Sequence, residues 1–379
     1  MPDIIKLSVY SHCNELGGKV WNPAIRWTRK HAVFVVLEDS AGNKGLGECW
    51  CFDSSPDALI AFLRTEVAPH IVGSKLGDNG KLLKPLLRSA TLSARHGILA
   101  SALSGVDIAL WDLRSRHAHQ PLWRYLSNVM ELGTANGCAY LYASGGLYGE
   151  NKSIADLVAE MQAMQNDGFD TVKMKIGGLS LEQDLERVHA VLDGLAKTSR
   201  VIIDGVYTYS PEAALHFYES LPGSRVVAFQ SPINASNIAG MKMLTASGVP
   251  VMATEAEYRA EIHSSYVNDA AVRYLQVAPV ACGGITRLIE LSHLLDQTDI
   301  KLSLEVSSTA VALLGAMHFA AAYGTVAHTE YHYVHQVFFN DLDIQQARNS
   351  AGVFQLSDAA GIGINLPEAH VSAAFSVDA

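Results

Sequence analysis

The sequence has few cysteines and no signal-like start, and these two shortages argue against a secreted, disulfide-stabilised protein. Its five cysteines show no paired spacing beyond Cys49-Trp50-Cys51. The first residues, MPDIIKLSVY, lack the basic start and long apolar core of a signal peptide. We therefore expect reduced thiols and a cytoplasmic location.

Charge is also scarce. Charged residues make up 17% of the chain, the net charge is −10, and no basic stripe appears. Because nucleic-acid-binding surfaces are rich in clustered Lys and Arg, we expect no nucleic-acid partner.

The segment from Val306 to Thr329 lacks Asp, Glu, Lys and Arg, and its length would allow a membrane span. It is rich in Ala, Gly, Ser and Thr, however, and it contains His318 and His328. We therefore expect a loop, a buried helix and the start of a strand there, and no membrane partner.

The chain has 379 residues, of which 49% are apolar, so it can form two domains or one barrel with an added lobe. Residues 1–130 indicate an α+β lobe. Residues 33–39 and 46–50 are two strand-like runs joined by a Gly/Asn turn. Residues 98–116 repeat apolar side chains every three or four positions, which predicts a helix with one apolar face.

From about Cys138 the pattern changes to strand then helix, repeated eight times. The strand-like runs are residues 138–144, 171–177, 201–205, 226–232, 249–255, 274–279, 301–307 and 326–332. Eight such repeats close a parallel βα barrel. The predicted fold class is thus α/β, a modified TIM barrel over residues 131–352, capped by an α+β domain. Residues 1–130 and the tail 353–379 form that cap.

Ligand-type side chains follow three successive strands of the predicted barrel. Asp204, Gln230 and Glu255 each close a short apolar run, and they stand 26 and 25 residues apart. Because the carboxyl ends of parallel strands meet on one face of a barrel, these side chains are expected to converge. Asp204 and Glu255 could instead cap the helices that follow them.

Lys173 and Lys175 lie two residues apart in TVKMKIGG, so on a strand both point to one face. If that face is the barrel interior, burial and a neighbouring cation lower the proton affinity of a lysine enough for it to act as a neutral base. If it is the exterior, the pair is solvated. The three strand ends that follow favour the interior.

The motifs TVKMKIGG and VIIDG, together with the polar strand ends, resemble the enolase superfamily, and most closely its mandelate racemase/muconate lactonizing enzyme branch. ARHGILASALSGVDIALWDL is similar to the last helix of that family's cap, and ACGGITRLIEL to the segment after its sixth strand. The resemblance implies one Mg²⁺, bound by Asp204, Gln230 and Glu255. It also implies a small-molecule carboxylate substrate whose α-proton is removed to give an enediolate, and a homo-oligomer.

In relatives of this kind the second lysine is the base and the first helps to hold the carboxylate, roles that the resemblance gives to Lys175 and Lys173. Two residues of the expected metal site depart from the family pattern. Gln230 stands where a glutamate is usual, and its amide oxygen binds a hard cation without adding charge. Val206 stands where the family has an asparagine.

The other side of the expected site departs further. Ala278 replaces the family's acidic or lysine residue five positions before the GG pair, and Glu305 stands at the end of the seventh strand, where racemases have a histidine. Glu305 could be a proton donor or an oxyanion partner if burial raises its pKa, or it could orient a loop. Glu330 matches a glutamate that bonds the substrate carboxylate in relatives.

Three aromatic residues and a row of alternating side chains complete the candidates. Trp21, Trp27 and Phe52 lie where cap loops cover the pocket in relatives, so they could shape the substrate site or simply anchor loops. His328, Glu330 and His332 share one face of a strand. We expect them to form structural hydrogen bonds rather than a second metal site.

We therefore expect a Mg²⁺-assisted enzyme acting on a small carboxylic acid. With one recognisable base, dehydration of a hydroxy or sugar acid fits better than racemisation, which needs proton exchange on two faces. A racemase, epimerase or cycloisomerase that uses Glu305 on the second face is the alternative. A degenerate barrel that binds a carboxylate without turnover is the rival outside catalysis.

Overall fold

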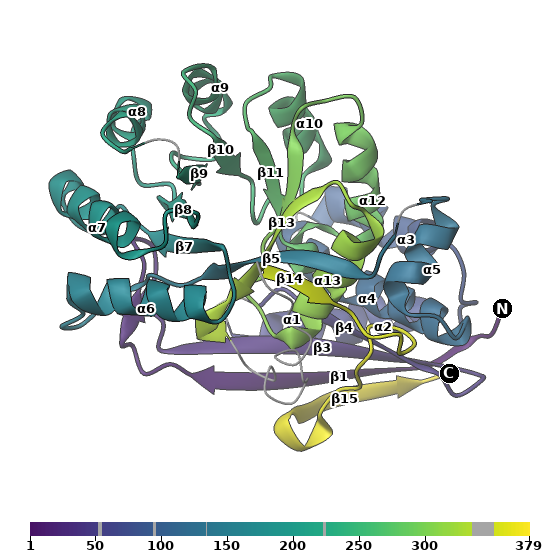
Figure 1. Cartoon of the computed structure of the whole chain (residues 1–379). Coiled ribbons are helices and arrows are strands. Elements are labelled where there is room, and N and C mark those ends of the chain that lie inside the picture. The colour runs from purple at the N-terminus through teal and green to yellow at the C-terminus, as the bar shows by residue number, and fades with distance from the viewer. Residues whose placement is uncertain (52–54, 94–95, 134, 223–224, 336–351) are drawn as a thin grey trace.

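The computed structural model describes residues 1–51, 55–93, 96–133, 135–222, 225–335 and 352–379. Figure 1 shows two layers, an antiparallel cap sheet and a barrel of parallel strands ringed by helices. Both termini lie on the same side of the molecule.

The cap sheet has the strand order β15-β1-β3-β4. Its strands are β1 (Ile4–Glu15), β3 (Arg29–Asp39), β4 (Lys44–Cys49) and β15 (Ser372–Asp378). Its helices are α1 (Asp57–Phe62), η1 (Leu63–Val67), α2 (Ala68–Ile71), α3 (Asn79–Ser93), α4 (His96–His117) and α5 (Leu122–Val129). The two strands and the helix that we predicted in this lobe are confirmed as β3, β4 and α4.

The barrel contains all eight predicted strands. They are β5 (Cys138–Ser144), β7 (Thr171–Lys175), β8 (Arg200–Asp204), β9 (Val226–Gln230), β10 (Val251–Ala253), β11 (Tyr274–Val277), β12 (Lys301–Leu304) and β13 (Val326–His332). Each pairs in parallel with the next, and β13 pairs with β5 to close the ring. The predicted fold class is confirmed.

Helices follow the strands around the outside of the barrel. They are α6 (Ile154–Asn166), α7 (Leu181–Gly194), α8 (Pro211–Glu219), α9 (Ile238–Ala246), α10 (Ala260–Asn268), α11 (Pro279–Cys282), α12 (Gly284–Leu295) and α13 (Ala310–Ala322). Ser153 and Ser180 close capping boxes at the first residues of α6 and α7, which fixes where those helices begin. Every residue of α13 is buried, as expected for the charge-free segment. Within the described residues, none of the helices combines the length and the apolar character that crossing a membrane requires.

The remaining elements join the cap to the barrel. Strand β2 (Val20–Trp21) pairs with β6 (Tyr148–Gly149), and β14 (Val353–Gln355) pairs antiparallel with barrel strand β5. Two short helical turns are η2 (Tyr333–His335) and η5 (Glu368–His370). The tail thus touches both lobes, because β14 joins the barrel and β15 joins the cap. The domain boundaries near residues 130 and 352 stay a prediction.

Two buried carboxylates dock the cap on the barrel. Asp107 of α4 accepts a hydrogen bond of 2.9 Å from the backbone N–H of Thr286. Its approach leaves no room for a side chain at Gly284, where an added Cβ would lie 2.4 Å from Asp107 Oδ2. Glu48 of β4 accepts hydrogen bonds from Thr309 and from the N–H of Ala312, at the start of α13. A carboxylate at a helix N-terminus is stabilised by the free N–H groups there.

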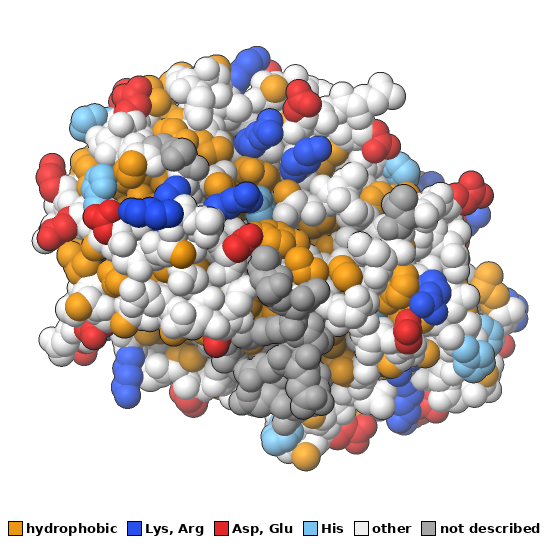
Figure 2. Space-filling model, in the orientation of Figure 1, with side chains coloured by type: hydrophobic (Ala, Val, Ile, Leu, Met, Phe, Trp, Pro, Cys, Tyr) orange, Lys and Arg blue, Asp and Glu red, His pale blue; other side chains and the backbone are white. Residues whose placement is uncertain are grey.

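The surface agrees with the composition. Figure 2 shows acidic, basic and apolar side chains mixed over the face that it draws. Of the five cysteines, Cys49, Cys51 and Cys282 are buried, and all five are free thiols in the structure.

Candidate active site

The predicted polar residues meet at the carboxyl ends of the barrel strands. In the sheet register Lys175 lies beside Asp204, and Asp204 lies beside Gln230. Two residues earlier on the same faces are Ile202 and Ala228, which belong to a small apolar cluster inside the barrel. The strand period of two therefore places the polar ends above an apolar floor.

Lys173 is the centre of this polar group. Its Nζ donates a hydrogen bond of 2.9 Å to Oε1 of Gln230, and it lies 2.5 Å from Glu330 and 3.7 Å from Asp204. Burial alone would lower the pKa of Lys173, but the Glu330 and Asp204 carboxylates outweigh burial and raise it. In turn the two lysines overcome the effect of burial on Glu330 and lower its pKa to about 2. Lys173 therefore stays an ammonium group, suited to holding a carboxylate.

Lys175 lies nearer the mouth and forms an ion pair with Asp204. Its main chain is held on two sides, because its N–H donates to the carbonyl of Gly146 at 3.3 Å and its carbonyl accepts from Arg187 at 3.0 Å. These two hydrogen bonds fix the position of the Lys175 Cα, from which the side chain extends. The base role of Lys175 and the carboxylate-holding role of Lys173 remain predictions.

Trp21 reaches the same strand through a stack of side chains. Its ring stacks on Tyr148 with centroids 4.4 Å apart, and the Arg187 guanidinium lies 4.1 Å from the centroid of Tyr148. The Tyr148 hydroxyl donates to Asp184, which also pairs with Arg187. The described contacts of Trp21 are thus those of a loop anchor, and its contact with substrate stays a prediction. Phe52 lies outside the described residues.

The three residues predicted to bind a metal are neighbours. Gln230 Nε2 donates a hydrogen bond to Glu255, whose carboxylate is half-buried after β10. Burial and the charge of Asp204 raise the pKa of Glu255 to about 7. Two carboxylates that repel each other, on the strands either side of Gln230, are donors that fit a hard divalent cation. The Gln230 oxygen is bonded to Lys173 in this structure. Among the described residues no group of three or more His, Cys, Asp or Glu side chains is placed to hold a metal.

The backbone is strained at the same strand ends. Val206 and Tyr207 after Asp204, Ser231 after Gln230, and Thr254 before Glu255 all have positive φ. Positive φ is costly for side chains with a Cβ, and most of all for a β-branched residue such as Val206 (φ 47°). Such strain persists where the surrounding structure imposes it, which is common at functional sites.

The side of the site near β11 and β12 is formed by Ala278 and Glu305. Ala278 is buried and offers no polar group. Glu305 is 6% exposed, and its Oε2 has no hydrogen-bond partner among the residues described. Burial and the charge of Glu330 raise the pKa of Glu305 well above its usual value. A raised pKa is the direction that a proton-donor role for Glu305 requires.

His328 and His332 are held as neutral rings. His328 lies among aromatic rings, with its centroid 4.9 Å from that of Tyr274, and burial lowers its pKa to about 4. Burial and the charges of Lys175 and Lys173 lower the pKa of His332 well below its usual value. The N–H of Val334 donates to Nδ1 of His332 at 3.3 Å. These surroundings agree with structural roles for both histidines.

Our reading of the sequence missed the cap's contribution, above all Lys30. Lys30 is 7% exposed and donates hydrogen bonds to the carbonyl and the hydroxyl of Ser307, just after Glu305. The sequence WTRKHAVFVV contains a pattern from which the burial of Lys30 could have been predicted. Counting back by two from Phe34, through Ala32, places Lys30 on the buried face of the strand. A charged residue in such a row is a departure from an apolar pattern.

Residues 156–370 match the family model described as enolase C-terminal domain-like. Residues 24–127 match the model of the mandelate racemase/muconate lactonizing enzyme N-terminal domain.

Individual relatives are similar over most of their length. Arabinonate dehydratase of Saccharolobus solfataricus is 27% identical over 307 residues, 79% of each chain. D-galactarolactone cycloisomerase of Agrobacterium fabrum is 25% identical over 79% of this chain and 77% of its own. Among solved structures, L-talarate dehydratase from Polaromonas sp. JS666, complexed with Mg and L-glucarate, has a TM-score of 0.85. It is 22% identical and covers 100% of both chains.

Proposed function

The chain belongs to the mandelate racemase/muconate lactonizing enzyme branch of the enolase superfamily and is a lyase or an isomerase, and we propose that it dehydrates a small hydroxy or sugar acid. The reaction would begin with removal of the proton α to the substrate carboxylate. The substrate would then lose a hydroxyl from the next carbon.

The observation that carries the proposal is the arrangement of Lys173 and Lys175. They come from one strand and both face the polar end of the barrel, where Asp204 pairs with Lys175 and Glu330 pairs with Lys173. A solvated surface pair would not be 1% and 7% exposed. The two side chains differ in surroundings, as a carboxylate-holding group and a base should.

Each residue has a separate task in this mechanism. Asp204, Gln230 and Glu255 would hold one Mg²⁺, which when bound favours negative charge on the substrate carboxylate. Lys173 and Glu330 would orient that carboxylate. Lys175 would accept the α-proton at Nζ, because it is the more exposed of the two lysines and lies beyond Lys173 along the strand.

Glu305 favours water loss over simple proton exchange. Its buried carboxyl has a pKa raised well above the usual value and an oxygen without a described partner, which suits donation of a proton to a leaving hydroxyl. The second candidate is an epimerase, racemase or cycloisomerase in which Glu305 serves the other face of the substrate. The same buried acid supports that candidate, and deuterium exchange separates the two.

A substrate screen tests the proposal directly. The protein is incubated in D₂O with a library of hydroxy acids, sugar acids and amino-acid derivatives, with and without Mg²⁺. The proposal expects Mg²⁺-dependent deuterium exchange at an α-carbon and formation of a 2-keto acid from at least one acid. Exchange with inversion and no water loss would favour the epimerase, and no exchange with any acid would contradict both. We also propose a homo-oligomeric assembly, which light scattering would test.

A further inference from the structure

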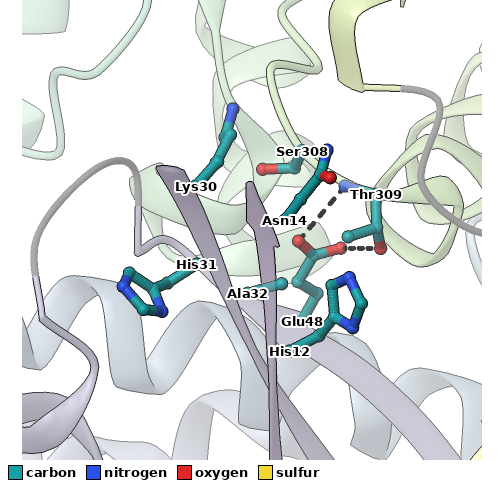
Figure 3. A pocket seen from close by; sticks show the side chains of 8 residues that line it. All are labelled: His12, Asn14, Lys30, His31, Ala32, Glu48, Ser308 and Thr309. Atoms are coloured by element: carbon teal, nitrogen blue, oxygen red, sulfur yellow. Dashed lines mark hydrogen bonds between the residues drawn. The ribbon is translucent and has the colours of Figure 1, made fainter. Parts of the chain in front are cut away.

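Lys30 reaches the barrel from the cap. On β3 the side chains of Ala32 and Phe34 pack in the barrel-side core, whereas Val33 and Val35 pack in the cap core. Lys30 shares the barrel-side face. Figure 3 shows its side chain rising from β3 beside Asn14 and Ser308, next to the bonded pair Glu48 and Thr309. The Nζ of Lys30 lies 3.0 Å from the hydroxyl oxygen of Ser307.

The charges of four residues on cap and barrel elements act on Lys30. Glu305 follows β12, Glu48 lies on β4, Glu330 lies on β13, and Lys175 lies on β7. His332 of β13 also feels the charge of Lys30, and His12 and His31 line the small pocket beside it. Burial lowers the pKa of Lys30 to about 7, although Glu305 and Glu48 oppose that shift.

The hydrogen bonds of Lys30 to Ser307 help to dock the cap, but docking alone does not require a charged group here. Ala32 and Phe34 fill the same face with apolar atoms, and burying an ammonium group is unfavourable unless its charge is used. Of the acids around Lys30, Glu48 is already bonded to Thr309 and Ala312, and Glu330 is paired with Lys173. Glu305 is the acid whose Oε2 has no hydrogen-bond partner among the described residues.

We propose that Lys30 is a positioning residue for Glu305, and that it holds the carboxylate which Glu305 becomes on giving its proton to the leaving hydroxyl. This inference rests on the proposed dehydration. In that step the bond between the β-carbon and oxygen breaks, and its electron pair stays on the oxygen. The Glu305 proton joins that oxygen, and water leaves. The electron pair of the broken carbon–hydrogen bond forms the carbon–carbon double bond. Solvent later returns a proton to Glu305.

The test uses the full chain with Mg²⁺ and three single variants. Lys30→Met removes the charge at nearly the same length, and Lys30→Arg keeps it. Lys44→Met is the matched control, because Lys44 is an exposed lysine on the neighbouring cap strand β4. The measurements are kcat for water loss between pH 5 and 9, and deuterium exchange at the α-carbon.

We expect Lys30→Met to lower kcat for water loss by about 10- to 100-fold, a fraction of what a positioned acid contributes. Exchange should stay within about threefold of the parent rate, since Lys175 performs it. The fall of kcat at high pH should move to higher pH, because Glu305 loses a cation that lowers its pKa. Lys30→Arg should recover most of the rate at neutral pH.

A double variant separates positioning from a general packing defect. If Lys30 acts through Glu305, then Lys30→Met combined with Glu305→Gln should lose no more activity than Glu305→Gln alone. Losses that multiply would overturn the inference, as would an equal loss of exchange and water loss in Lys30→Met.

A measurement that needs no substrate distinguishes an error in this inference from an error in the proposed reaction. Carbon-13 NMR of glutamate-labelled protein follows the Glu305 carboxyl through a pH titration in the parent and in Lys30→Met. Assignment comes from the signal lost in Glu305→Gln. A higher Glu305 pKa in Lys30→Met supports the pairing even if no acid is turned over, and an unchanged pKa overturns it even if dehydration is found.

Discussion

Lys173 donates a 2.9 Å hydrogen bond from its Nζ to Oε1 of Gln230. The other end of the same amide donates to Glu255. Gln230 therefore links the lysine expected to hold the substrate to a carboxylate expected to hold the metal. A glutamate at this position would accept from Lys173 but could not donate to Glu255. A glutamine here, where the resemblance leads us to expect a glutamate, would thus change both the charge and the bonding of the site.

Gln230→Glu is expected to tighten Mg²⁺ binding by roughly tenfold or more, because a charged oxygen replaces a neutral one. Without Mg²⁺ the new carboxylate would repel Glu255 and lower the free energy of unfolding. Isothermal titration measures the first effect, and thermal unfolding with and without Mg²⁺ measures the second. Gln183→Glu, at an exposed capping position of α7, is the control. Equal or weaker Mg²⁺ binding in Gln230→Glu would refute the role given to Gln230.

Lys175→Ala should abolish turnover and deuterium exchange together, since both begin with the same proton transfer. The expected loss is about 10²–10⁴-fold, the usual contribution of a positioned base. Lys173→Ala should also raise KM, because Lys173 would hold the substrate carboxylate. Circular dichroism checks the fold, and Lys197→Ala, an exposed lysine, is the control. Normal exchange by Lys175→Ala would rule out Lys175 as the base.

Glu305→Gln separates dehydration from epimerisation. If Glu305 is the acid for a leaving hydroxyl, exchange at the α-carbon continues and formation of the 2-keto acid stops. If Glu305 serves the second face, exchange of one enantiomer continues and that of the other is lost. Proton NMR in D₂O with each enantiomer reads both outcomes. Unchanged water loss and unchanged exchange would leave Glu305 with no part in the reaction.

Val206→Asn is expected to stabilise the protein by about 1 kcal/mol, because asparagine adopts positive φ more readily than a β-branched residue. The hydrogen bond of 3.0 Å from the Val206 N–H to Oδ1 of Asp204 does not depend on the Val206 side chain and should remain. Urea unfolding at a constant m-value measures the change. Val206→Ala removes the β-branch but lacks the short polar side chain that helps asparagine to adopt positive φ, so it should gain less. A destabilised Val206→Asn would show that contacts of the valine side chain outweigh the backbone strain.

Lys30 should make the stability of the parent protein depend on pH. Its folded pKa is about 7, whereas a lysine in the unfolded chain keeps its proton to about pH 10.5. Between these values the unfolded state binds more protons, so this group makes stability rise with pH. The difference in unfolding free energy between the parent and Lys30→Met should therefore grow in the parent's favour from pH 7 to 9. Urea unfolding at several pH values tests this, and parallel curves would refute it. The Lys44→Met control should follow the parent.

The barrel and the core of the candidate site could be predicted from the sequence because they depend on local repetition. A run of alternating or apolar residues identifies a strand, and the last inward residue of each parallel strand reaches the same end of the barrel. That rule was sufficient to bring Lys175, Asp204 and Gln230 together, and the structure places them on neighbouring strands in register. The resemblance to a family then supplied expected roles for these residues, which local repetition does not contain.

Tertiary structure decided what the cap adds and how each polar group is bonded. Lys30 meets Ser307 across 277 positions of sequence, and Glu48 meets Thr309 across 261. No local period links such residues, since their approach depends on how two separately folded layers dock. Local sequence also does not show that the Trp21 ring stacks on Tyr148, since an aromatic ring there could equally have faced a substrate. Nor does it show that the Gln230 amide is bonded to Lys173 at one end and to Glu255 at the other. Sequence determined which groups face the end of the barrel, and packing between the cap and the barrel determined their partners and hence their charge.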